Sequence, residues 1–190
     1  ACAELITTAY RMSFLDDMGI KLATVRAGNV IGGGDWATDR LIPDFFRSLS
    51  LNQKLIIRSP EAIRPWQHVL EPLAGYIKLA EKLYIDGSDF TGAWNFGPND
   101  FDNKSVQWIV EHLCASIPAT DWQIDSQPQL HEANTLKLDS SKAKELLNWQ
   151  PQWNLSTALN KTIEWHTAWE KGENMKGISL QQIRAYENKE

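Results

Sequence analysis

The chain has 190 residues, of which 43% are hydrophobic, and a formal net charge of −5 at pH 7. A negative net charge removes the electrostatic attraction on which nucleic-acid binding depends, and no run approaches the roughly 18 apolar residues of a membrane span. Cys2 and Cys114 lie in no metal-binding spacing, and the histidines are scattered, which favours reduced thiols and no metal. These features predict a cytoplasmic globular protein that binds neither nucleic acid nor membrane.

The first residues read as a helix followed by a strand. Apolar residues at helical spacing cover 3–15 and end before Gly19, and residues 21–27 form a short apolar run typical of a buried strand. The helix starts without an N-cap residue, and a strand of this kind needs parallel neighbours. We therefore expect the chain to be part of a longer protein.

Three consecutive glycines, residues 32–34, follow Asn29 at the end of that strand. Ligands bind beyond the carboxyl ends of strands in open α/β sheets, and glycines let the backbone approach them closely. A flexible surface turn is the alternative, and a bare glycine triplet forms one more often. The stretch is neither a P-loop nor a dinucleotide-binding G-x-G-x-x-G, because no Gly-Lys-Ser/Thr and no helix follow directly.

The middle of the chain alternates helices and short strands. The pattern predicts a helix over 41–49, with Pro43 in its first turn, and a strand over 55–58. A Pro-interrupted loop is expected over 59–66 and a long helix from about His68 to Ile85. The apolar residues assigned to the buried face of that helix are Leu73, Ile77, Ala80, Leu83 and Tyr84.

The last part of the chain continues the same alternation. The expected strands cover 94–97 and 136–138, and the expected helices cover 105–117, 142–147 and 155–169. The assigned end residues are Ser105 as N-cap, Asp139 or Ser140 as N-cap, and Asn148 in a left-handed conformation. A short peripheral helix is expected after Gly177.

Several arginines lie in predicted loops or beside apolar residues. A planar guanidinium suits a pyrophosphate, because it donates two parallel charge-assisted hydrogen bonds. Solvation at the surface is the alternative for any one of them, but Pro65 and Trp66 stiffen and partly bury the surroundings of Arg64. The arginines in question are Arg26, Arg40, Arg47, Arg58 and Arg64.

Four motifs, in this order and at this spacing, resemble the C-terminal half of the extended short-chain dehydrogenase/reductases that act on nucleotide sugars. They begin with Arg-Ala-Gly-Asn-Val-Ile-Gly at 26–32 and Arg-Pro-Trp-Gln-His-Val at 64–69. Trp-Asn-Phe-Gly follows at 94–97, and Ser-Lys-Ala-Lys-Glu-Leu-Leu-Asn-Trp-Gln-Pro at 141–151. The resemblance covers essentially the whole chain.

The resemblance implies an α/β fold, namely the C-terminal part of a Rossmann-like NAD(P)-binding fold with the family's smaller substrate-binding domain. Residues 1–36 and about 68–100 would be Rossmann-associated, and about 37–67 and 101–190 would form mainly the substrate-binding region. The N-terminal NAD-binding half is expected to be absent. In the family a catalytic Tyr-x-x-x-Lys precedes an Ala-Glu pair like Ala3-Glu4, so the catalytic residues are expected just upstream of residue 1.

The resemblance also assigns roles to matched positions. Asn29 would hydrogen-bond the sugar diphosphate, Arg64 would clamp it, and Glu132 would accept from the ribose hydroxyls. The backbone at Ala27 and Gly28 would pass close to the nicotinamide carboxamide of NAD. The residues expected to flank the nucleotide or run along its base are Leu41, Ile42, Arg47, Ile56 and Arg58.

Within the family, Gly-Asn-Val-Ile-Gly-Gly-Gly-Asp-Trp and Arg-Pro-Trp-Gln-His-Val are most similar to the versions in dehydratases of a CDP-sugar. That similarity implies an NAD-dependent homo-oligomeric enzyme that turns a CDP-sugar into its 4-keto-6-deoxy product, with this chain inactive alone. One alternative is another nucleotide-sugar epimerase or dehydratase. The other is a nucleotide-sugar-binding or assembly module without catalysis.

Overall fold

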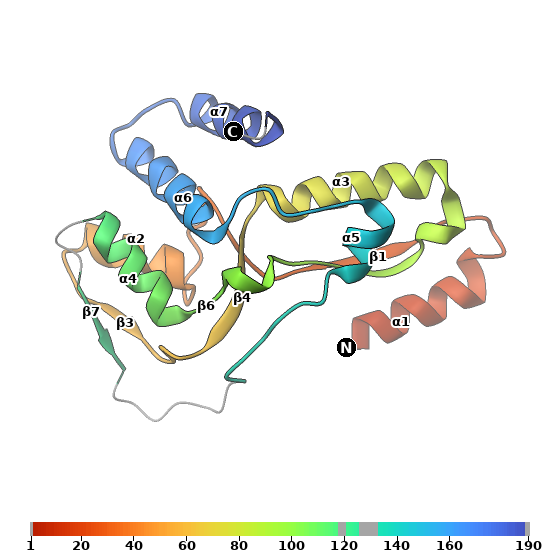
Figure 1. The fold of residues 1–190 in the computed structure, drawn as a ribbon, viewed down its shortest axis with the longest axis horizontal. Coiled ribbons are helices and arrows are strands. Elements are labelled where there is room, and N and C mark those ends of the chain that lie inside the picture. Colours follow the sequence, from red (N-terminus) through yellow and green to blue (C-terminus); the bar gives the residue numbers. More distant parts are fainter. Residues whose placement is uncertain (1, 118–120, 126–132, 189–190) are drawn as a thin grey trace.

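The computed structural model describes residues 2–117, 121–125 and 133–188, and its strands form three small sheets (Figure 1). Neighbouring strands pair in parallel, except that β4 and β6 are antiparallel. The sheets are β1 (Ala23–Ala27) with β5 (Gly92–Phe96), β2 (Asn29–Ile31) with β4 (Ile63–His68) and β6 (Asn103–Ser105), and β3 (Leu55–Ile57) with β7 (Trp122–Ile124). Mixed helices and parallel strands confirm the α/β class.

Helices alternate with these strands along the chain. The helices are α1 (Cys2–Tyr10), α2 (Leu41–Ser50), α3 (Leu70–Ile85), α4 (Val106–Ser116), α5 (Ser141–Leu147), α6 (Leu155–Glu170) and α7 (Met175–Glu187). A π-helical segment, Arg11–Leu15, extends α1. Among the described residues, no helix has the length and apolarity that a bilayer crossing needs.

The helix ends follow local capping chemistry. Ser105 caps α4 as expected, because its hydroxyl accepts from the Trp108 backbone N–H at 3.2 Å. Asn148 ends α5 with φ +47°, the left-handed conformation that asparagine tolerates. Asn174 caps α7 by accepting from the N–H of Gly177, so the last helix begins before that glycine rather than after it.

The chain passes from one sheet to the next at a single residue. Gly28 lies between β1 and β2, and a Cβ there would meet the Pro65 carbonyl oxygen at 2.1 Å, so only glycine fits. Beyond it, Asn29 pairs with Trp66 in the parallel register of β2 and β4. The first two motifs of the sequence are therefore adjacent strands.

The expected loop at 59–66 is wrong, because β4 runs through Pro65. Proline removes a ladder donor, which normally excludes it from strands with neighbours on both sides. Here the pairing with β2 begins only at Trp66, and Pro65 ends the pairing with β6, opposite Asn103. The missing N–H of Pro65 therefore falls where one pairing ends and the other begins.

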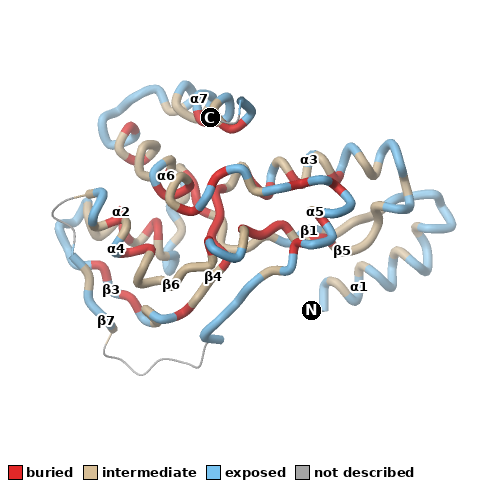
Figure 2. The backbone as a smooth tube through the Cα atoms, in the orientation of Figure 1, coloured by how far each residue is buried: buried red, intermediate tan, exposed pale blue. Residues whose placement is uncertain are grey.

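Two hydrophobic clusters hold the elements together, and Figure 2 shows buried backbone concentrated along β4 and β5. The first joins α2, α4 and α6 to β3 and β4, with Phe45, Ile109 and Leu159 at its centre. The second joins α3 and α5 to β5, through Leu79, Phe96 and Leu147. The predicted division into Rossmann-associated and substrate-binding regions stays a prediction.

The predicted buried face of α3 is wrong except at Leu83, which packs against the second cluster. Ile77 is 70% exposed and Tyr84 is 92% exposed, whereas Glu71, Gly75 and Leu79 face the interior. Gly75 sets this face, because a Cβ there would lie 2.3 Å from the Phe96 ring. The helix therefore packs closely on β5 through residues that an apolar pattern does not mark.

Large apolar side chains stay exposed on both helices that flank the β1–β5 sheet, α3 and α1 (Figures 1 and 2). No residue of α1 is buried. Glu4 nevertheless ties α1 to β1, accepting from the Thr24 hydroxyl at 2.8 Å. The exposed apolar residues in these regions are Leu5, Ile6, Tyr10, Met12, Phe14, Leu73, Ile77, Tyr84 and Ile85.

The remaining sequence expectations differ in their outcome. The strand predicted at 136–138 is not formed; an isolated bridge pairs Thr135 with Ile63 instead. The helix predicted over 155–169 is formed as α6; Leu155, Leu159 and Thr162 are buried on it, whereas Trp169 at its end is 48% exposed. Glu132 lies outside the described residues.

Candidate functional site

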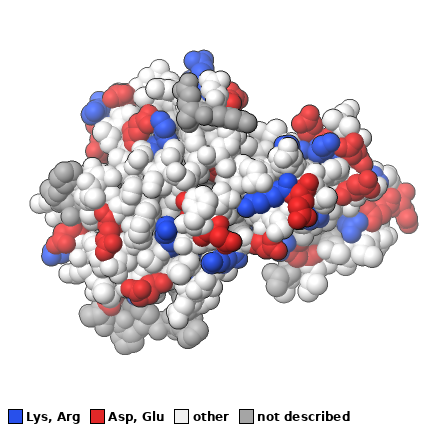
Figure 3. Space-filling view, viewed as in Figure 1, with Lys and Arg blue, Asp and Glu red and all other residues white. Residues whose placement is uncertain are grey.

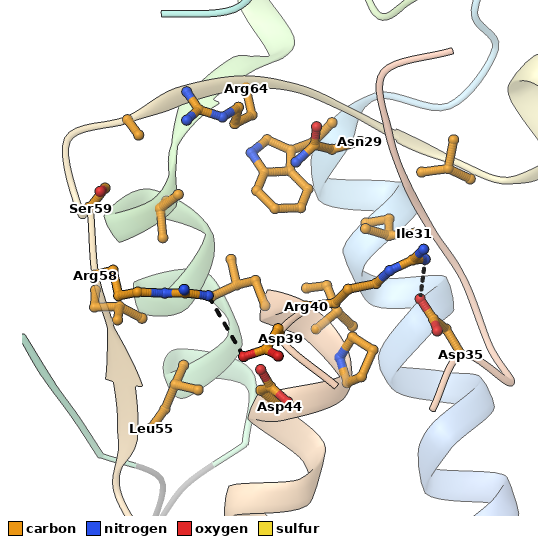
Figure 4. A pocket seen from close by; sticks show the side chains of 18 of the residues that line it. Asn29, Ile31, Asp35, Asp39, Arg40, Asp44, Leu55, Arg58, Ser59 and Arg64 are labelled. Atoms are coloured by element: carbon orange, nitrogen blue, oxygen red, sulfur yellow. Dashed lines mark hydrogen bonds and ion pairs between the residues drawn. The ribbon is translucent and has the colours of Figure 1, made fainter. Parts of the chain in front are cut away.

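A pocket of about 600 Å³ opens where β2, β3 and β4 meet the start of α2. Its walls come from residues 28–32, from the loop before α2, and from β3 and the turn between β3 and β4 (Figure 4). Among the residues that the structure describes, the charged side chains in the lining are Asp35, Asp39, Arg40, Asp44, Arg58 and Arg64. Charged and apolar residues thus share one concave surface, as ligand sites require.

Strand pairing positions one end of this pocket. The register of Asn29 opposite Trp66 places the amide of Asn29 beside β4, two residues beyond Arg64. Figure 4 shows Asn29 and Arg64 at the same end of the pocket. The Arg64 guanidinium donates to the carbonyl oxygens of Ile63 at 2.9 Å and Asn134 at 3.5 Å. A ligand that engages Arg64 would compete with these backbone acceptors.

Two ion pairs cross the other part of the pocket, drawn as dashed lines in Figure 4. Arg40 Nη1 lies 3.2 Å from Asp35 Oδ2, and Arg58 Nη2 lies 3.9 Å from Asp39 Oδ1. All four side chains keep substantial exposure, so each pair is weak and can open for a ligand.

Of the residues expected to bind the nucleotide, the structure brings six to the pocket wall. These are Asn29, Leu41, Ile42, Ile56, Arg58 and Arg64. Gly28, expected near the cofactor, also lines the pocket, whereas Ala27 is the last residue of β1 and is not part of the lining. Their roles toward a ligand stay predictions.

Arg47 is not part of the pocket lining, and its expected place beside the nucleotide stays a prediction. It pairs with Asp44 on the same helix and donates to the Trp36 carbonyl oxygen at 3.1 Å. The side chain is therefore turned back to hold the loop before α2. Through Asp44, which lines the pocket, and through that loop, Arg47 supports the pocket wall.

The glycine triplet forms a turn at Gly33 and Gly34, and that turn packs against α6. A Cβ at Gly33 would lie 2.0 Å from the Trp165 ring, and Gly34 has φ +80°. The triplet packs against α6 because no side chain intervenes. Only Gly32 reaches the pocket wall.

Sequence reasoning missed the carboxylates Asp35, Asp39 and Asp44, and left Arg40 without an assigned place. Asp35 directly follows the glycine triplet, and Asp44 lies one residue beyond Pro43 in the first turn of α2. Asp39 takes φ +60°, which no local pattern announces. Their convergence depends on the packing of α2 under β3.

A buried polar cluster lies behind β4. Glu71 accepts from the backbone N–H groups of Gln152 and Trp153 and from the Tyr186 hydroxyl, at 2.7 to 3.1 Å. Burial raises the pKa of Glu71 and lowers the pKa of His68 to about 4. These groups lie outside the pocket lining. The contacts of Glu71 join α3 to the segment before α6 and to α7.

The fold is similar to part of the fold of solved nucleotide-sugar epimerases and dehydratases. One similar structure is UDP-glucose 4-epimerase of Thermotoga maritima with UDP-glucose, with a TM-score of 0.71 and 20% identity over 86% of this chain and 50% of that chain. Another is dTDP-glucose 4,6-dehydratase of Bacillus anthracis in complex with NAD, with a TM-score of 0.67 and 18% identity over 93% and 52%. These likenesses confirm the fold class.

In sequence, the chain is 50% identical to CDP-glucose 4,6-dehydratase of Salmonella typhimurium, over 192 aligned residues. The alignment covers 97% of this chain and 53% of the relative, so the chain spans about half the length of that enzyme. No protein-family model matches the chain. The resemblance drawn from the four motifs is confirmed.

Proposed function

We propose that this chain supplies the nucleotide-sugar-binding part of an NAD-dependent dehydratase that converts CDP-glucose to CDP-4-keto-6-deoxyglucose. One observation carries the proposal: six of the residues matched to nucleotide binding line one pocket in a chain that is 50% identical to a CDP-glucose 4,6-dehydratase. We place the enzyme in the cytoplasm and expect it to be a homo-oligomer.

The end of the pocket near Asn29 suits the diphosphate. The amide of Asn29 can donate to a phosphate oxygen, and the guanidinium of Arg64 can donate two parallel bonds to the same group. Leu41, Ile42 and Ile56 supply apolar walls farther along the pocket, where a flat base can lie. Glu132 keeps its proposed contact with the ribose hydroxyls.

NAD, when bound, would supply the hydride acceptor for C4 of the sugar and the donor that returns the hydride to C6, with water lost across C5 and C6. The backbone at Ala27 and Gly28 can meet a neutral carboxamide there, because Gly28 lies at the pocket wall directly after Ala27. The sequence contains no Gly-x-x-Gly-x-x-Gly loop for the cofactor phosphates. This chain therefore fits only the nicotinamide end of NAD.

The sequence also lacks the general base that the reaction needs. No tyrosine is followed four residues later by lysine: Phe14, Ala80, Ser88 and Glu190 stand at those positions. In the proposed arrangement the chain binds and orients the sugar nucleotide, and proton transfer at the sugar depends on a residue outside this chain.

We expect the purified chain alone to bind CDP without turning over CDP-glucose. Calorimetric titration with CDP tests binding, and incubation with NAD and CDP-glucose followed by alkaline absorbance of the 4-keto sugar tests turnover. Formation of the keto product by this chain alone would show that its catalytic residues are misassigned. Absence of CDP binding would contradict the nucleotide site itself.

Titration and turnover measurements also distinguish the proposed function from two others. An epimerase or dehydratase for another nucleotide sugar predicts tighter binding of UDP or dTDP than of CDP. A non-catalytic module predicts that CDP-glucose binds and that no turnover appears even when a full-length CDP-glucose dehydratase sequence is rebuilt around this chain.

A further inference from the structure

The charges that line the pocket conflict with an anionic ligand. Within the part of the chain that the structure describes, the charged side chains of the lining are three aspartates and three arginines, which sum to zero, whereas a sugar nucleotide carries negative charge on both phosphates. A carboxylate beside such a ligand weakens binding unless it makes a contact of its own. At least one aspartate in the lining therefore calls for a different role.

Two of the three aspartates are already engaged with nearby groups. Asp35 accepts from the Ala37 backbone N–H at 3.1 Å and pairs with Arg40 at 3.2 Å. Asp44 pairs with Arg47 on the same helix. These contacts neutralise both carboxylates and hold the loop and the first turn of α2.

Asp39 differs from them in three ways. Its side chain is 86% exposed, and its ion pair with Arg58, at 3.9 Å, is at the limit for such a contact. Its backbone has φ +60°, a conformation that aspartate and asparagine tolerate better than most residues. Directly before Arg40, the N-cap residue of α2, this turn holds the Asp39 carboxylate at the pocket (Figure 4).

The position of Asp39 matches the base of the nucleotide, given the proposed function on which this inference rests. In Figure 4 Arg58 and Asp39 lie away from the end occupied by Asn29 and Arg64. With the diphosphate at that end, the base falls beside Arg58. Asp39 and Arg58 then meet its edge.

Cytosine differs from uracil and thymine at this edge. Its exocyclic amine at C4 donates, next to acceptors at N3 and O2, whereas the other two bases present an acceptor oxygen at C4. A carboxylate accepts from the amine, and a guanidinium donates to the neighbouring acceptors. The oxygen of uracil or thymine would instead face a carboxylate with no hydrogen between them.

We propose that Asp39 accepts from the exocyclic amine of cytosine while Arg58 donates to the base acceptors, so that this pair sets the preference of the pocket for CDP. The ion pair between the two side chains keeps the donor, Arg58, and the acceptor, Asp39, side by side. Asp39 is then a specificity-determining residue.

The test is the ratio of CDP to UDP affinity, measured by calorimetric titration of the full chain. Asp39→Asn should lower this ratio by about 5- to 150-fold, because an amide can donate to the oxygen of uracil as well as accept from cytosine. Removing the charge alters the affinity of both nucleotides alike, so the ratio isolates base recognition. Asparagine also tolerates φ +60°, and a melting curve checks the fold.

Asp39→Gly provides a second variant, because glycine accepts the positive φ and removes the acceptor. It should lower the ratio through weaker CDP binding, and the matched control Asp17→Asn, on an exposed turn outside the pocket, should leave the ratio unchanged. A CDP preference that survives in both Asp39 variants overturns the assignment while the proposed function stands. If the unmodified chain binds none of CDP, UDP and dTDP, the proposed function fails first.

Discussion

At the scale of single residues, Arg64 is the side chain through which diphosphate binding is most directly measured. Arg64→Ala should weaken CDP binding by roughly 10- to 150-fold, or about 1.5–3 kcal/mol, because a charge-assisted contact is lost. Arg64→Lys should restore only part of it, because an ammonium cannot donate two parallel bonds. Calorimetric titration gives the dissociation constants.

The control for this experiment is Arg11→Ala, which removes a guanidinium that pairs with Asp16 away from the pocket. It should leave the CDP dissociation constant unchanged. An unchanged constant for Arg64→Ala as well would mean that Arg64 serves the backbone carbonyls of Ile63 and Asn134 and not a ligand.

His166 should make the stability of the chain sensitive to acid. It is buried, stacked on Phe46 with ring centroids 3.7 Å apart, and burial lowers its pKa from 6.5 to about 4. Because the folded pKa lies below the unfolded one, the stabilising contribution is present above pH 6.5 and is lost as pH falls toward 4. The loss can reach about 3 kcal/mol for this group.

His166→Phe removes that titration while keeping a flat ring on Phe46. Urea unfolding between pH 7.5 and 4 should show a smaller loss of unfolding free energy for the variant than for the unmodified chain. Parallel curves for the two proteins would contradict the assignment of acid sensitivity to His166.

At the scale of secondary-structure elements, two glycines in helices make opposite predictions. Gly75→Ala should destabilise the chain by about 1–3 kcal/mol, because the added Cβ would overlap the Phe96 ring at 2.3 Å. Gly177→Ala in α7 should stabilise it by up to about 1 kcal/mol, since the nearest atom lies at 3.4 Å and alanine favours helix.

Chemical denaturation of both variants beside the unmodified chain gives the two changes in unfolding free energy. The pair controls for itself, because each variant adds one methyl group to a helix. A Gly75→Ala variant as stable as the unmodified chain would mean that α3 can shift away from β5.

The ends of helices were predictable from sequence where local hydrogen bonds and backbone preferences determine them. The buried face of a helix was less predictable, because tertiary contacts determine it. Ser105 and Asn148 mark helix ends through their own hydrogen bonds and backbone preferences, so α4 and α5 were placed well. The face of α3 was misplaced because Glu71 and Gly75, a charged residue and a glycine, form its packing side. That choice depends on Phe96 and on partners more than 80 residues away.

The pocket residues also fall into those that the sequence could predict and those that it could not. Asn29 and Arg64 belong to motifs with a recognisable pattern, and strand pairing brings them to one wall. Asp39 and Asp44 carry no such pattern, because their place depends on where α2 packs and on one left-handed residue. Arg47 was expected beside the ligand, and its contact with the Trp36 carbonyl oxygen could not be read from the sequence, because it depends on how the loop before α2 folds.

At the scale of the whole molecule, acidic and basic side chains are mixed on the surface, whereas exposed apolar side chains gather on α1 and α3. Acidic and basic side chains are interspersed over the face shown in Figure 3, whereas α1 and the outer side of α3 expose large apolar residues. Exposed apolar surface of this kind favours association. We expect the purified chain to self-associate as its concentration rises.

Sedimentation velocity across a concentration series measures this association. Ile77→Glu should shift the distribution toward the monomer, because a carboxylate on the outer side of α3 resists burial. Gln181→Glu, which adds the same charge at an exposed position on α7, should leave the distribution unchanged. A single monomeric species at every concentration would contradict the expectation.

The contacts of Glu71 also bear on the order in which the chain can fold during synthesis. Its carboxylate is satisfied by residues 152, 153 and 186, so the first turn of α3 depends on partners made by the ribosome much later. Until α7 has emerged, Glu71 cannot be buried with all its donors, and water must satisfy it instead. The first sheets and α3 can form early, but the contact of α3 with α7 can close only after α7 has been synthesised.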